Sequence, residues 1–146
     1  MIDPYKAGLF SRNPYAKKRP CHGELVVVLD GKMENRKLQL ITPISRALCT
    51  GEIHELIVTD EEQAGPGQEV NRIAYWGFFE VTSGTVVVAG DEVRIGNSVL
   101  GTIAGFDETH MPNHLNIVIK AAERKTGVEL GLALEEKIII TKKEEE

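Results

Sequence analysis

The sequence predicts a mainly β protein, folded as an antiparallel β-barrel or sandwich of eight or nine short strands with one or two short helical turns. β-branched runs are short, as in Leu25–Leu29 (LVVVL) and Thr85–Ala89 (TVVVA), which is typical of strands. Turn residues recur about every 8 to 12 residues, as in all-β domains. No segment keeps a helical period beyond about two turns. A length of 146 residues suits one such domain.

The expected strands are apolar or alternating runs bounded by glycine, proline or acidic residues. They span residues 25–29, 37–41, 53–58, 70–81, 85–89, 92–95, 99–106, 115–121 and 137–141, and a further short strand fits residues 128–132. Gly96-Asn97 is predicted to form a two-residue hairpin turn, and Gly77 a bulge or a close backbone approach. Thr42 suits a helix N-cap and Pro43 the first helical position, so helical turns are expected over residues 42–48.

One β domain is expected over residues 21–141, after a basic N-terminal arm at residues 1–20 and before a frayed charged tail at residues 142–146. The arm is expected to lie over the domain or a neighbouring subunit, and contact with phosphate or RNA is the alternative. The net charge of −5 argues against a general nucleic-acid-binding protein, because neutralising phosphates requires clustered Lys and Arg.

The sequence also predicts a cytoplasmic protein without a membrane segment. No apolar run is long enough to span a bilayer, and no basic segment followed by an apolar one opens the chain as a signal peptide would. The two cysteines, Cys21 and Cys49, form no C-x-x-C pair and are expected to be reduced.

The richest group of polar residues lies in Gly105–Ile119 (GFDETHMPNHLNIVI). Pro112 makes its first half a loop, so the two histidines do not form a helical zinc motif. Three interpretations remain open. The side chains could bond the loop backbone, form a site for a small polar ligand, or hold a divalent metal ion such as zinc. The ligand site would use Asp107, His110, Asn113 and His114, and the metal site His110, His114 and Asp107.

A second group of polar residues lies at the strand expected over residues 53–58. His54 is predicted to share a face with Glu52 and Leu56, and Glu55 to lie on the opposite face. His54 is expected to be a core residue with its hydrogen bonds satisfied, or else to meet His110 or His114 in space as an acid or base. His54, Glu52 and Glu55 are therefore added to the ligand-binding candidates.

A third group is Cys21–Glu24 (CHGE), which could join Cys49 in binding a soft metal, although its spacing matches no known cluster and a simple strand entry is expected. The usual phosphate-binding glycine loops and the G-x-S-x-G nucleophile motif are absent from the sequence. Common nucleotide-binding folds and α/β-hydrolases are therefore not indicated.

Three segments together resemble an uncharacterised family of short bacterial and archaeal proteins. They are Thr42–Val58 (TPISRALCTGEIHELIV), Arg72–Glu80 (RIAYWGFFE) and Gly105–Ile119, and the resemblance covers residues 20 to 140. No activity is established for that family, so the resemblance implies an identity without a chemistry.

A weaker resemblance is to the glucitol/sorbitol-specific enzyme IIA component of the sugar phosphotransferase system. It rests on Gly84–Gly96, Gly101–Phe106 and Asn113–Ile119, mostly through turn glycines, and implies a related β-barrel. The phospho-accepting histidine of that family would fall within Tyr75–Phe79 (YWGFF), which holds no histidine. Because phosphoryl relay needs that nucleophile, the resemblance implies a barrel without the phosphotransfer role.

The sequence thus leads to a cytoplasmic β-barrel binding module for a small polar ligand, and a dimer is expected because the aromatic run Tyr75–Phe79 could seal an interface. The alternative is a metal-assisted hydrolase or isomerase that uses the same His and Asp residues. Phosphotransfer at a relocated histidine is a third hypothesis.

Overall fold

The structure, a computed structural model, describes residues 19–143, and within this range it contains strands and no helix. The mainly β prediction is confirmed. The basic arm falls largely outside the described residues, as does the end of the charged tail. The strands are β1 (Cys21–Val28), β2 (Lys32–Met33), β3 (Leu38–Gln39), β4 (Ser45–Leu48), β5 (Ile53–Thr59), β6 (Glu69–Val70), β7 (Ile73–Ser83), β8 (Thr85–Val88), β9 (Glu92–Ile95), β10 (Ser98–Asp107), β11 (Asn116–Lys120) and β12 (Lys137–Thr141).

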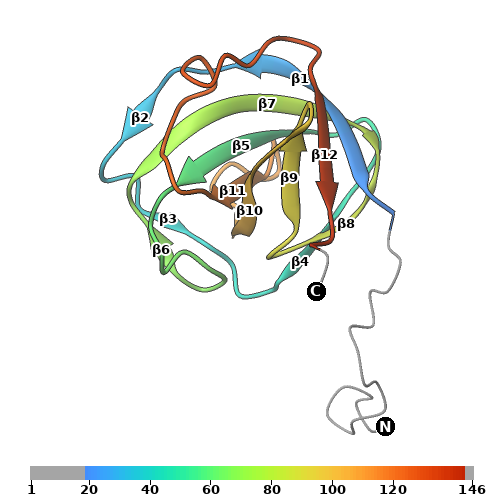
Figure 1. The fold of residues 1–146 in the computed structure, drawn as a ribbon. Coiled ribbons are helices and arrows are strands. Elements are labelled where there is room, and N and C mark those ends of the chain that lie inside the picture. Colours follow the sequence, from blue (N-terminus) through green and yellow to red (C-terminus); the bar gives the residue numbers. More distant parts are fainter. Residues whose placement is uncertain (1–18, 144–146) are drawn as a thin grey trace, which may run out of the picture.

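Eight of these strands form one large sheet in the order β1-β12-β9-β10-β11-β5-β7-β2, and β1 also pairs with β7. The β1–β7 pairing joins distant parts of the sheet, so that seven strands surround a common interior (Figure 1). Two small sheets, β3-β6 and β4-β8, lie beside it. No helix in the described part of the chain is long and apolar enough to cross a membrane.

The antiparallel prediction is wrong for one pair of strands, because β5 and β11 run parallel. Parallel neighbours need a long connection between them, and here the chain forms β6 to β10 before it returns at Asn116. The sheet is therefore mixed. A sequence pattern cannot reveal this, since the expected run of short strands and turns suits either direction of pairing.

The helical turns expected over residues 42–48 are absent, because Ser45–Leu48 forms β4 and pairs with β8. The N-cap and proline signals are local, and pairing with the β-branched run Thr85–Val88 overrides them. The strand fitted to residues 128–132 is also wrong. Glu129 N donates to the Thr126 hydroxyl and Leu130 N to the Thr126 carbonyl, which winds this segment into turns.

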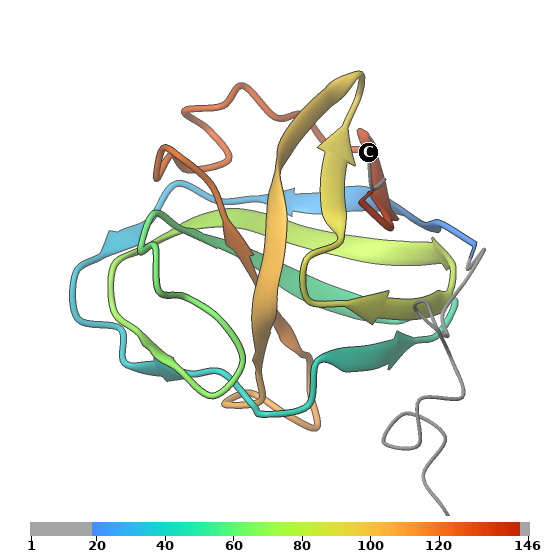
Figure 2. The same ribbon diagram turned by 60° about the horizontal axis from the view of Figure 1, so that its bottom comes forward.

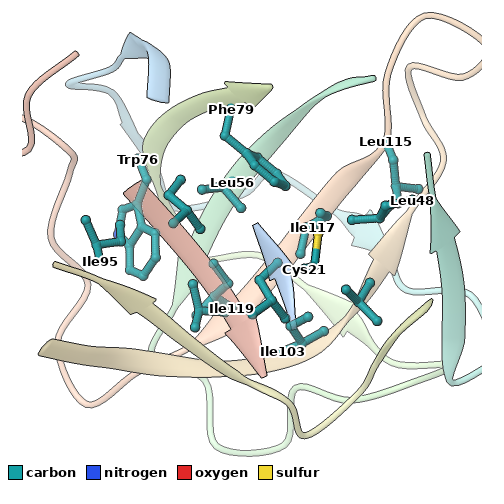
Figure 3. Packing of buried hydrophobic residues seen from close by; sticks show 14 of the residues in the cluster. Cys21, Leu48, Leu56, Trp76, Phe79, Ile95, Ile103, Leu115, Ile117 and Ile119 are labelled. Carbon is teal, nitrogen blue, oxygen red and sulfur yellow. The ribbon is translucent and has the colours of Figure 1, made fainter. Parts of the chain in front are cut away.

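The buried side chains form two clusters on opposite faces of the large sheet. The first fills the interior of the ring and is shown in Figure 3; its largest members include Leu25, Leu56, Trp76, Phe79, Phe106, Ile117 and Ile119. Trp76 and Phe79 thus belong to the core. Two of the four aromatic residues in Tyr75–Phe79 are therefore buried within the chain itself and need no subunit interface to cover them. The second cluster covers the outer face of the sheet and includes Leu38, Leu40, Ile57, Val70, Ile73 and Val118.

Candidate metal centre

The register of the large sheet brings polar residues from three strands into one row. Asp107 on β10 pairs with Asn116 on β11, and Asn116 pairs with Glu55 on β5. On its other side, Glu55 pairs with Phe78 on β7. Glu55 shares the outer face with Ile57, because alternate side chains of a strand point the same way and Ile57 belongs to the outer cluster. The row therefore lies on the outer face, at the edge of the outer cluster.

The loop between β10 and β11 carries two histidines to this row. Successive turns shape the loop: Met111 N donates to the Glu108 carbonyl, and Asn113 N and His114 N both donate to the His110 carbonyl. As a result the rings of His110 and His114 lie side by side, with centroids 5.0 Å apart. The loop lies at the bottom of Figure 2, below the strands that carry the row.

Glu55, His110 and His114 each offer one ligand atom, and these atoms all lie within 4.8 Å of one another. Ligand atoms around a zinc ion lie about 2.0 to 2.2 Å from it, so modest side-chain rotation would bring all three into contact with one ion. Glu55 is buried, His114 is half-buried and His110 is exposed. The group therefore has a closed side and an open side.

Among the described residues, no Lys or Arg side chain forms an ion pair with the buried carboxylate of Glu55. Burial raises the pKa of Glu55, and the charges of His110 and Arg36 only partly oppose that rise. Burial lowers the pKa of His114, against a smaller opposite effect of Asn116. Nε2 of His114 is buried, lies 3.5 Å from Oε1 of Glu55 and makes no hydrogen bond of normal geometry, and the same holds for the buried Oδ1 of the neighbouring Asn116. A cation between Glu55 and His114 would satisfy both side chains.

The amide of Asn113 lies 2.9 Å from Nδ1 of His114. It can donate to this nitrogen or, turned over, accept from it, and the second arrangement leaves Nε2 free to bind a cation. A hollow of about 380 Å³ opens beside the imidazole ring of His114. It is lined by Gly51, Ile53, Phe78, Asn113 and His114. The predicted ligand-binding residues Asn113 and His114 thus line a solvent-reachable hollow.

Asp107 lies next to this group but has other partners. Its Oδ2 accepts from Gln39 N, and its Oδ1 accepts from Thr109 N and from the Asn116 amide. These bonds hold the start of the histidine loop against β11. In the position that the sequence suggested for Asp107, the structure places Glu55 beside the two histidines.

His54 lies on the opposite face of β5, in line with Leu56, and not with the other two histidines. Its Nδ1 accepts from Leu115 N, and its Nε2 lies 3.1 Å from Oε1 of Glu52. Glu52 also accepts from Cys49 N. His54 and Glu52 therefore connect the start of β5 to the entry of β11. Of the two hypotheses for His54, this arrangement agrees with a core histidine whose hydrogen bonds are satisfied.

Replacing His54 by alanine is expected to lower the free energy of unfolding by about 1 to 3 kcal/mol, because it leaves the buried Leu115 N–H without an acceptor. Metal affinity should stay within about twofold, since His54 faces away from Glu55. Urea denaturation and a zinc titration check the two statements. A large loss of metal affinity without a loss of stability would contradict this structural role.

One residue near the centre, Arg36, was not among the candidates that the sequence predicted. Arg36 donates from Nη2 to Nε2 of His110 at 3.2 Å and from Nε to the Tyr75 hydroxyl at 3.1 Å. Nothing local marks Arg36, which precedes a strand of two residues. Glu55 was predicted as a ligand-binding residue but not as a metal ligand, and its signal is that a charged side chain within the apolar run Ile53–Val58 must face something polar. The third group, Cys21–Glu24, begins with a core residue, Cys21, and Cys49 is exposed.

Comparison with known proteins gives a family and no chemistry. Residues 15–141 match a family described as "Family of unknown function (DUF6917)". No curated protein and no solved structure matches the chain. The resemblance to the enzyme IIA component of the phosphotransferase system therefore gains no support, and the first resemblance, to an uncharacterised family, agrees with the match.

Proposed function

The chain belongs to the DUF6917 family of unknown function, and we propose that it binds a divalent metal ion through Glu55, His110 and His114 and uses this ion to hold a small polar ligand. The observation that carries the proposal is the gathering of Glu55, His110 and His114, whose ligand atoms all lie within 4.8 Å of one another, with the buried Nε2 of His114 3.5 Å from the carboxylate of Glu55. Two imidazoles and a carboxylate at this spacing are a common set of metal ligands in proteins.

A metal ion explains why both side chains are buried together. A buried carboxylate without a cation costs free energy in its charged form, and the guanidinium of Arg36, whose charge acts on Glu55, donates its hydrogen bond to His110 instead. An ion bound to Glu55 and His114 supplies the missing charge at the buried end. His110, on the exposed loop, completes the set from the open side.

The ligand types favour zinc or ferrous iron over magnesium or calcium. Two imidazoles and one carboxylate are ligands that zinc and iron accept, whereas magnesium and calcium prefer oxygen ligands only. Three protein ligands leave a coordination position open, as in catalytic zinc sites. That position would take an oxygen of the small polar ligand. The open coordination position also favours a second candidate function, metal-assisted hydrolysis or isomerisation. In that case the ion would polarise an oxygen of the bound substrate.

Metal binding is tested by a chelator-buffered zinc titration of the full chain and by metal analysis of protein purified without chelators. We expect one ion per chain, and a loss of affinity of more than about 100-fold in His110→Ala and in His114→Ala, because even outer partners of metal ligands account for about 10- to 100-fold. His22→Ala is the matched control, since His22 is exposed on β1. Equal affinities in all four proteins, or no stoichiometric ion, would overturn the proposal.

A further inference from the structure

Arg36 lies at the edge of the metal centre with most of its donors unused. Its guanidinium carries five N–H donors, of which one reaches the Tyr75 hydroxyl and one Nε2 of His110. Among residues 19–143, no carboxylate forms an ion pair with it. Other arginines of this region do pair with acids: Arg46 with Glu108, Arg72 with Glu34 and Asp60, Arg94 with Glu92, and Arg124 with Glu34.

The fold holds this guanidinium in place. The backbone N–H of Arg36 donates to the Asn71 carbonyl, and the Tyr75 hydroxyl accepts from its Nε. The Tyr75 side chain packs against the outer hydrophobic cluster. Arg36 is itself half-buried. A positioned, partly desolvated guanidinium without an acid partner is suited to binding a carboxylate or a phosphate through two parallel hydrogen bonds.

A bound metal ion would increase the need for an anion. The nitrogen of His110 to which Arg36 donates is one that an ion can take, and an ion there would release this donor. The centre would then combine a divalent cation and a guanidinium with the negative charge of Glu55, while the neighbouring Asp107 already accepts three hydrogen bonds. This excess of positive charge is partly shielded from water, so an anion between the two cations would be strongly favoured.

We infer that the ligand of the metal centre is a small carboxylate, with one oxygen on the open position of the ion and the carboxylate held by Arg36. The inference rests on the proposed metal function and adds the class of ligand. Phosphate, which carries more oxygens, would need further donors, and Arg36 is the one unpaired guanidinium among the described residues at this centre.

The same geometry predicts that metal and carboxylate help each other to bind. Without an anion, the charge of Arg36 opposes a cation at His110, and a bound carboxylate removes that opposition. Because such coupling is reciprocal, benzoate should tighten cobalt binding in the wild-type protein. In Arg36→Gln the repulsion is gone, so cobalt alone should bind as tightly or more tightly, while the coupling to benzoate should disappear.

The test uses the full chain loaded with Co²⁺, whose visible spectrum reports a change in its ligands, and titrations with benzoate, acetate and inorganic phosphate. At saturating cobalt, Arg36→Gln should bind benzoate about 10- to 100-fold more weakly, as expected for loss of hydrogen bonds to a charged group. Arg36→Lys, which keeps the charge and loses the planar fork, should lie between. Arg94→Gln is the matched control, because Arg94 pairs with Glu92 on β9.

The outcomes separate the two proposals. If the wild-type protein takes up no cobalt, the metal centre itself is refuted. If cobalt binds and benzoate affinity is the same in the wild-type protein and Arg36→Gln, the metal centre stands and the role of Arg36 is refuted. If phosphate binds through Arg36 and carboxylates do not, the ligand class is wrong. Weaker benzoate binding in Arg36→Gln with unchanged binding in Arg94→Gln supports the inference.

Discussion

Gly77→Ala is expected to destabilise the fold by more than about 4 kcal/mol, the range of the most damaging single substitutions. A Cβ atom at this position would lie 1.9 Å from the backbone oxygen of Val27, and the φ angle of Gly77 is +152°. Val28 and Gly77 are partners in the β1–β7 pairing that joins the large sheet into a ring. The close backbone approach predicted for Gly77 is thus confirmed, and neither β1 nor β7 can move without opening the ring.

Urea denaturation of the purified variants measures this effect. Gly96→Ala is the matched control, because Gly96 has a φ of +61° and no atom within 4 Å of its Cβ position. It should cost only about 1 to 2 kcal/mol, the penalty for a left-handed conformation. Similar losses in both variants would show that backbone conformation, and not the contact with Val27, sets the cost at Gly77.

Glu55→Gln is expected to abolish zinc binding and yet to leave the metal-free protein as stable as the wild type or more stable. Burial raises the pKa of Glu55, so its charged form is disfavoured in the folded state, and stability is lost as the pH rises through the unfolded pKa towards the folded one. At neutral pH a neutral amide removes this cost. The wild type should gain about 2.7 kcal/mol at a free zinc concentration of 100 times Kd, and the variant should gain almost nothing.

Glu52→Gln is the matched control and should behave in the opposite way. The backbone N–H of Cys49, and then His54, lower the pKa of Glu52. Its carboxylate therefore stabilises the fold above its unfolded pKa, and this contribution is lost as the pH falls through the folded pKa. The amide should reduce stability at neutral pH and keep the stabilisation by zinc. Denaturation with and without zinc compares all three proteins, and a Glu55→Gln protein that still gains stability from zinc would contradict the metal centre.

Local patterns predict much of this fold because they report which backbone conformation a segment prefers. The β-branched run Thr85–Ala89 became β8, and Gly96-Asn97 became the turn between β9 and β10. Local preference predicted the wrong structure at residues 42–48, where helix-start signals are present but the segment pairs with β8. A cap contributes about 1 kcal/mol, which the pairing of β4 with β8 outweighs.

For the candidate site, too, the sequence determines one part and the tertiary structure determines the other. That residues 108–114 form a loop carrying two histidines follows from Pro112 and from the strand pattern after it, and short-range sequence alone determines this. Which carboxylate joins them was decided by the parallel pairing of β5 with β11, which sets Glu55 beside Asn116 across a separation of about sixty positions in the chain. Pairing at that distance depends on how the whole ring closes and on which faces it buries. Only the tertiary structure could therefore select Glu55, turn His54 to the other face and bring Arg36 to the edge of the centre.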